Sequence, residues 1–103
     1  MIYSATGRHG TARFDGRTVT ISKRKGFGRS EIVVPLQQIT GVSTGRMGIT
    51  RYFRVGMASR PDPKWNASSL RHDDLTLLHS SGAAPQFDDL RRKIMEALTN
   101  VVG

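Results

Sequence analysis

Residues 11–23 read TARFDGRTVTISK, and this stretch decides the fold class. Two β-prone runs flank Asp15-Gly16, a dipeptide typical of the type I′ turn of a β-hairpin. After the turn, Val19 and Ile21 alternate with polar residues, which is the period of a strand that buries one face. The stretch therefore predicts an antiparallel hairpin with an apolar inner face.

Further strands are predicted on the C-terminal side of this hairpin. Residues 31–34 are β-prone and stop at Pro35, which cannot donate a hydrogen bond in a sheet. Residues 36–42 predict a tight turn and a short strand, and residues 49–57 and 74–79 predict two more strands.

The segment 49–57 contains one charge at a buried position of its pattern. Arg51 shares the parity of Ile49, Phe53 and Val55, whereas Tyr52 lies on the other parity. This conflict indicates a β-bulge or a shifted register.

One amphipathic helix is predicted from about residue 85 to residue 100. Pro85 suits a first helical turn, and Asp88 and Asp89 complement the dipole there. The basic triplet 91–93 follows these carboxylates by about four residues, so we expect a charge-paired, solvated face. The apolar stripe consists of Phe87, Leu90, Ile94, Leu98 and Val101.

Residues 58–72 show no periodicity, and a loop of that length is functional or mobile. The loop contains the only tryptophan, Trp65. An exposed Trp65 would anchor a partner, and a buried one would cover the flank of the fold. We favour the buried position.

These segments together predict one domain over residues 1–103, with strands between about 2 and 79. The domain is expected to be mainly β: a small barrel of six or seven antiparallel strands, capped by the C-terminal helix. A length of 103 residues without cysteine excludes a two-domain enzyme and a disulfide scaffold.

The net charge of +8 is concentrated in the first sixty residues, which hold eleven Lys and Arg against two acidic residues. The densest cluster lies in a glycine-containing turn and consists of Lys23, Arg24, Lys25 and Arg29. Such a cluster can bind phosphates, although a solvated turn that deters edge pairing is the alternative. Phe27, within the same turn, either inserts into an interface or packs back on the sheet.

Three sequence blocks carry a family resemblance: FDGRTVTI at 14–21, IVVPLQQITGV at 32–42 and FDDLRRKI at 87–94. Over residues 10–98 the chain resembles a bacterial pleckstrin-homology-like (PH-like) family of unknown function, found in high-GC Gram-positive bacteria and their bacteriophages. The resemblance implies a PH-like barrel and a tendency to form oligomers. Because eukaryotic PH domains bind inositol phosphates with basic hairpin residues, it also implies a binding role for the turn 23–29. The loop 58–72 departs from the family pattern.

We therefore expect a non-enzymatic interaction module that acts through protein–protein contacts, with a host protein, or through self-assembly as a homo-oligomer. The proposed contact residues are Lys23, Arg24, Lys25, Phe27, Arg29 and Trp65. The alternative is a phosphate-directed binder of an anionic phospholipid surface or of nucleic acid.

The sequence contains no recognisable catalytic motif. His9, His72 and His79 are scattered without metal-ligand spacing, and neither a nucleophile motif nor a phosphate-binding loop occurs. We expect no enzymatic activity, no metal and no cofactor. An N-terminus without an export signal, and the lack of an apolar run long enough to span a membrane, favour the cytoplasm.

Overall fold

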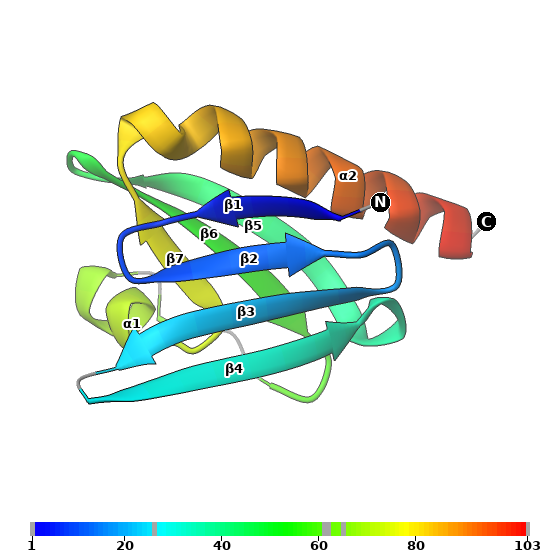
Figure 1. The fold of residues 1–103 in the computed structure, drawn as a ribbon, viewed down its shortest axis with the longest axis horizontal. Helices are drawn as coiled ribbons and strands as arrows, with labels where there is room; N and C mark the ends of the chain where they lie inside the picture. Colours follow the sequence, from blue (N-terminus) through cyan, green and yellow to red (C-terminus); the bar gives the residue numbers. More distant parts are fainter. Residues whose placement is uncertain (1, 26, 61–62, 65, 103) are drawn as a thin grey trace.

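The computed structural model describes residues 2–25, 27–60, 63–64 and 66–102. Seven strands and two α-helices lie within them (Figure 1). The strands are β1 (Tyr3–Thr6), β2 (Gly10–Phe14), β3 (Thr18–Lys25), β4 (Gly28–Pro35), β5 (Ile39–Met47), β6 (Thr50–Met57) and β7 (Thr76–His79). The helices are α1 (Ala67–His72) and α2 (Ala84–Val102), and short 3-10 turns cover Leu36–Gln38 and Ser81–Ala83.

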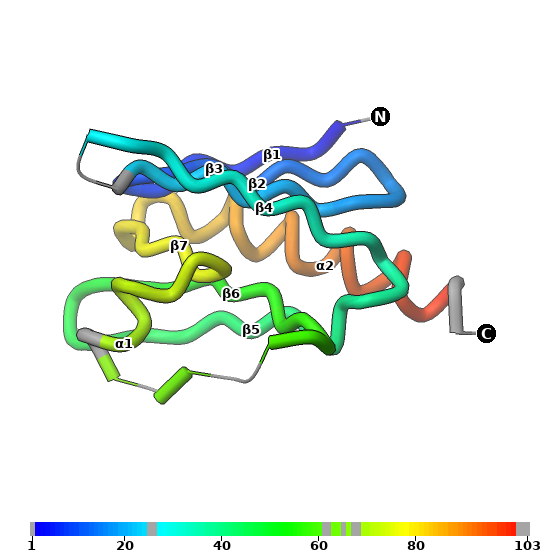
Figure 2. Tube along the Cα trace, turned by 90° about the horizontal axis from the view of Figure 1, so that it is seen from below, coloured from blue at the N-terminus to red at the C-terminus, as the bar shows by residue number. Residues whose placement is uncertain are grey.

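The strands form two antiparallel sheets, ordered β1-β2-β3-β4 and β5-β6-β7, which Figure 2 shows as two layers. The predicted mainly-β chain with a C-terminal helix is confirmed, but the predicted closed barrel is wrong. Helix α2 packs against β1 and against β5, which are one edge strand of each sheet. The strands β1 and β5 are not paired with each other, as they would be in a closed barrel. The apolar stripe of α2 covers the opening between them instead.

The turn between β2 and β3 differs from the predicted type. Only Gly16 has a positive φ, of 98°, whereas a type I′ turn requires positive φ at two central residues. The Asp15 carboxylate accepts hydrogen bonds from the backbone N–H groups of Arg17 and Thr18, both at 2.8 Å. These bonds favour the charged carboxylate and hold the pKa of Asp15 below its ordinary value.

The core lies between the sheets and beneath α2. Val19 and Ile21 on β3 are buried, as the alternation predicted, and Phe53 of β6 packs on Phe87 of α2 with ring centroids 5.3 Å apart. Comparable burial is found for Ala5, Ala12, Phe14, Val34, Val55, Leu75, Leu77, Leu90 and Ile94.

Arg54, rather than Arg51, is the buried arginine of β6. Arg54 is 2% exposed, and its Nε donates to the carboxylate of Asp73 at 2.9 Å. The hydroxyl of Thr76 donates to the same carboxylate oxygen at 2.6 Å. The β5–β6 pairing does contain a register shift, but it lies between Ile39 and Gly41.

The loop predicted over 58–72 contains the short helix α1. The side chain of Asn66 caps its start by accepting from the Ser69 N–H at 2.9 Å, and Leu70 is buried. Trp65 lies outside the described residues, so its predicted burial stays a prediction. Within the described part of the chain, no helix is long and apolar enough to cross a membrane.

The basic triplet of α2 is exposed at Arg91 and Arg92, as expected of a solvated face, but it also makes contacts with the sheets. Arg91 donates from Nε to the Val42 carbonyl at 2.9 Å, and the Lys93 ammonium lies 5.4 Å from the centre of the Tyr3 ring. Arg92 pairs with Asp89, three residues earlier. Two of these three cations therefore hold the helix to β5 and β1.

Candidate functional site

Lys23 is not part of an exposed basic cluster. Its side chain shares the inward parity of Val19 and Ile21 on β3 and is only 7% exposed. The ammonium donates to the backbone carbonyls of Arg71 at 2.7 Å and Asp73 at 2.8 Å, at the C-terminal end of α1. A cation is favourable there because the last carbonyls of a helix lack partners within the helix. Lys23 therefore has a structural role, and its predicted binding role stays a prediction.

Arg24 and Arg29 form the exposed part of the predicted cluster. They are directly opposite each other in the β3–β4 pairing, and both side chains are exposed. Like charges that face each other across two strands are destabilising. Among the described residues, no carboxylate forms an ion pair with either guanidinium. The two guanidiniums are therefore not neutralised by an ion pair within the described residues.

Phe27, at the end of the same hairpin, is fully exposed rather than packed back on the sheet. Ile49, at the β5–β6 turn, is 91% exposed. Figures 1 and 2 place the β3–β4 and β5–β6 turns at the same end of the molecule. The side chain of Lys25 lies outside what the structure describes.

The β1–β2 turn adds two residues to this region that the sequence reasoning did not place there, the cationic Arg8 and His9. The backbone N–H of Arg24 donates to the His9 carbonyl at 2.7 Å, and the N–H of Arg8 donates to the Leu78 carbonyl at 2.9 Å. A Cβ added at Gly10 would lie 2.3 Å from the Ser22 carbonyl oxygen, so glycine is required there. These contacts fix the turn against both sheets.

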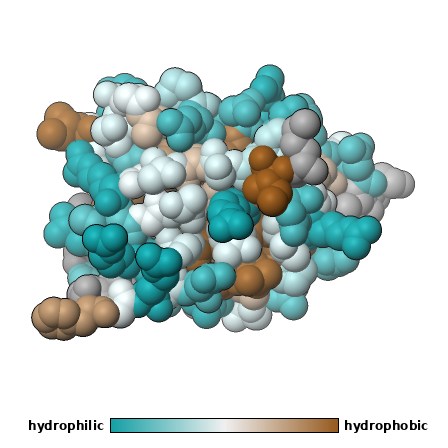
Figure 3. All heavy atoms as spheres, in the orientation of Figure 1, coloured by the Kyte–Doolittle hydropathy of each residue, from teal (hydrophilic) through white to brown (hydrophobic). Residues whose placement is uncertain are grey.

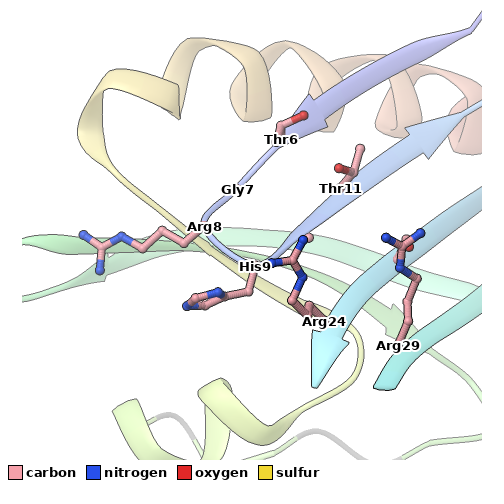
Figure 4. A pocket seen from close by; sticks show the side chains of 9 residues that line it. Thr6, Gly7, Arg8, His9, Thr11, Arg24 and Arg29 are labelled. Carbon is pink, nitrogen blue, oxygen red and sulfur yellow. The ribbon is translucent and has the colours of Figure 1, made fainter. Parts of the chain in front are cut away.

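These segments surround a hollow of about 260 Å³, which we call the arginine hollow (Figure 4). Its lining consists of Thr6, Gly7, Arg8, His9, Gly10, Thr11, Ser22, Arg24 and Arg29. In Figure 4 the side chains of Arg24 and Arg29 extend beside each other toward the turn, whereas Arg8 extends away from them. The hydroxyl groups of Thr6, Thr11 and Ser22 complete the polar lining.

The arrangement suits an anion with several oxygen acceptors. Guanidinium groups donate in a planar fork that matches phosphate oxygens, and hydroxyls supply further donors. The hollow is open on the outer face of the first sheet, and Figure 3 shows this face as largely hydrophilic. One carboxylate is near: Glu31 is opposite Ser22, two pairs along the β3–β4 pairing from Arg24 and Arg29.

A sequence signal for the missed residues does exist. Gly7 and Gly10 bracket Arg8-His9, as glycines do where a turn closely approaches another backbone. The pairing of Arg24 with Arg29 likewise follows from a hairpin centred on residues 26 and 27.

Within the described residues, no group of three or more His, Asp and Glu side chains is placed to hold a metal ion. Comparison with protein-family models, curated proteins and solved structures finds no match to the chain.

Proposed function

We propose that the protein is a non-enzymatic, phosphate-directed binding module that docks on an anionic phospholipid surface. The observation that carries the proposal is the exposed pair Arg24 and Arg29, opposite each other and in no ion pair with a described carboxylate, beside the hydroxyls of the arginine hollow. An anion placed between the two guanidiniums would relieve their repulsion and accept hydrogen bonds from both.

The two exposed apolar side chains favour a membrane over a nucleic acid. Phe27 and Ile49 lie at turns on the same end of the molecule as the arginine hollow. Apolar side chains beside arginines can enter the interface of a bilayer while the guanidiniums contact the lipid phosphates. Base stacking would instead need aromatic side chains distributed along a basic groove.

The order of the elements supports a PH-like identity as part of the same proposal. Seven strands and then a C-terminal helix are the element order that the resemblance implies, although the two sheets do not close into the implied barrel. The proposed site uses the β3–β4 hairpin and the β1–β2 turn. In this proposal the protein contacts the membrane from the cytoplasmic side.

Vesicle co-sedimentation tests the proposal directly. The full chain should bind vesicles of equal parts phosphatidylcholine and phosphatidylglycerol, and not phosphatidylcholine alone, with weaker binding at about 200 mM than at about 50 mM salt. Arg24→Gln and Arg29→Gln should each weaken binding about fivefold, since a cation near an anionic surface contributes about 1 kcal/mol. Arg17→Gln, just before the start of β3 and far along the strand from Arg24, is the matched control.

Phe27→Ser distinguishes the two phosphate-bearing partners. It should weaken vesicle binding about tenfold or more because the buried aromatic area is lost, and leave binding to duplex DNA unchanged. Binding to DNA without binding to vesicles would instead assign the site to nucleic acid. No salt-dependent binding to either would contradict the proposal.

Self-assembly is a second candidate, favoured by one specific observation. Strand β4 is at the edge of its sheet over eight residues, and Val33 on it is 53% exposed. An exposed, β-branched edge strand can pair with the same strand of a second copy. Light scattering should then show an oligomer that Val33→Lys converts to a monomer. A monomer at all concentrations would contradict this candidate.

A further inference from the structure

A second hollow, of about 360 Å³, shares His9 and Arg24 with the arginine hollow and extends to α1 and β7. We call it the α1 hollow. Its lining consists of His9, Lys23, Arg24, Arg71, His72, Leu77 and Leu78. Its volume falls in the range of small-molecule sites, roughly 300–1,000 Å³.

The α1 hollow combines an apolar wall with a cationic rim. Leu77 is buried and Leu78 half-buried on β7, and both line the hollow. Arg24, Arg71 and His72 are exposed around it. No Asp or Glu is found among its described lining residues. The hollow therefore offers positive charge directly beside an apolar surface.

The segments around the α1 hollow are held in place by hydrogen bonds. The buried ammonium of Lys23 bonds to the carbonyls of Arg71 and Asp73, which ties α1 to β3. The Arg8 N–H bonds to the Leu78 carbonyl, which ties the β1–β2 turn to β7. A site whose walls are fixed before binding loses less conformational entropy when a ligand enters.

We propose that the α1 hollow binds a small organic phosphate that carries an apolar body. The guanidiniums of Arg24 and Arg71 and the imidazoles of His9 and His72 face the phosphate, and the apolar body lies against Leu77 and Leu78. This site is separate from the proposed membrane contact, although Arg24 takes part in both. Lys23 orders the wall and does not contact the ligand.

Calorimetric titration with a series of alkyl phosphates tests the proposal. Inorganic phosphate should bind weakly, and affinity should rise through butyl, hexyl and octyl phosphate by about fourfold for each methylene group buried, until the hollow is filled. Affinities that do not depend on chain length would overturn the proposal.

Two substitutions locate the binding. Arg71→Gln should weaken octyl phosphate binding roughly tenfold, since it removes a charged donor. Arg29→Gln is the matched control, because Arg29 lines only the arginine hollow, and it should leave the gain in affinity from butyl to octyl phosphate unchanged. Binding that Arg29→Gln weakens and Arg71→Gln does not would overturn the proposal. Circular dichroism checks that both variants fold.

The same variants separate this proposal from the membrane proposal. Loss of vesicle binding in Arg29→Gln with retained octyl phosphate binding supports both sites as distinct. Should vesicles fail to bind the unmodified chain, the chain-length series still decides the α1 hollow. If Arg71→Gln weakens binding to octyl phosphate and to phosphatidic acid vesicles alike, the natural ligand is a lipid, and if only to octyl phosphate, a soluble phosphate.

Discussion

Lys23 and Arg24 are adjacent cations with opposite roles, so their substitution separates folding from binding. Lys23→Met removes an ammonium that donates to the carbonyls of Arg71 and Asp73 at the end of α1. Methionine keeps a similar unbranched apolar stem. The variant therefore removes the charge-assisted bonds while it retains most of the packing.

The expected loss follows from those two bonds. Each hydrogen bond from a charged donor contributes about 1.5–3 kcal/mol when its partner is left behind. Removal of the ammonium also relieves its desolvation cost, which offsets part of this loss. We expect Lys23→Met to lower the free energy of unfolding by about 2–3 kcal/mol, or the Tm by about 10–20 °C for a chain of this size.

Urea denaturation followed by circular dichroism measures the effect, with Arg24→Gln as the control. Arg24→Gln should change the unfolding free energy by at most about 0.5 kcal/mol, because Arg24 is exposed and faces a like charge. Vesicle binding should weaken about fivefold in Arg24→Gln and stay unchanged in folded Lys23→Met. A Lys23→Met variant with unaltered stability and weakened vesicle binding would refute the reasoning.

Three further outcomes are expected. Gly10→Ala should destabilise the protein by about 1–3 kcal/mol in urea denaturation, because its Cβ would meet the Ser22 carbonyl; Gly41→Ala, with open space around it, is the control. Glu31→Gln should strengthen binding to anionic vesicles by up to about fivefold, and unchanged binding would mean that Glu31 does not affect the arginine hollow. Asp15→Ala should lower the unfolding midpoint at neutral pH. Because folding lowers the pKa of Asp15, its carboxylate stabilises the fold above its ordinary pKa, so the difference between the two proteins should disappear as the pH falls through the folded pKa. A difference that persists at low pH would contradict this role.

The sequence pattern predicted an element correctly where the residues of that element alone determine its structure. The alternation of Val19 and Ile21 predicted the inner face of β3. Pro85 and the apolar stripe predicted a helix from about residue 85, and α2 starts at Ala84. Helix α1 was missed because six residues with two serines carry no periodic signal. Its Asn66 cap was the available clue.

Buried charges could not be predicted because their partners are far along the chain. Arg54 is compensated by Asp73, nineteen residues later, and Lys23 by carbonyls 48 and 50 residues later. The alternation along β3 places Lys23 on the inner face. That position is favourable for a cation only because the carbonyls at the end of α1 lie beside it. The arginine hollow was predicted in part, since Arg24 and Arg29 pair locally while Arg8 joins them through contacts with β7.

The β1–β2 turn is bonded to both sheets, through the amide of Arg24 to His9 and the amide of Arg8 to Leu78. Separation of the two layers at this end would have to break the bond from Arg8 to Leu78, because the turn belongs to the first sheet. The exchange of the Arg8 amide proton with deuterated solvent should consequently slow when a ligand binds. Its rate would report how often this end of the protein opens, without any label attached to it.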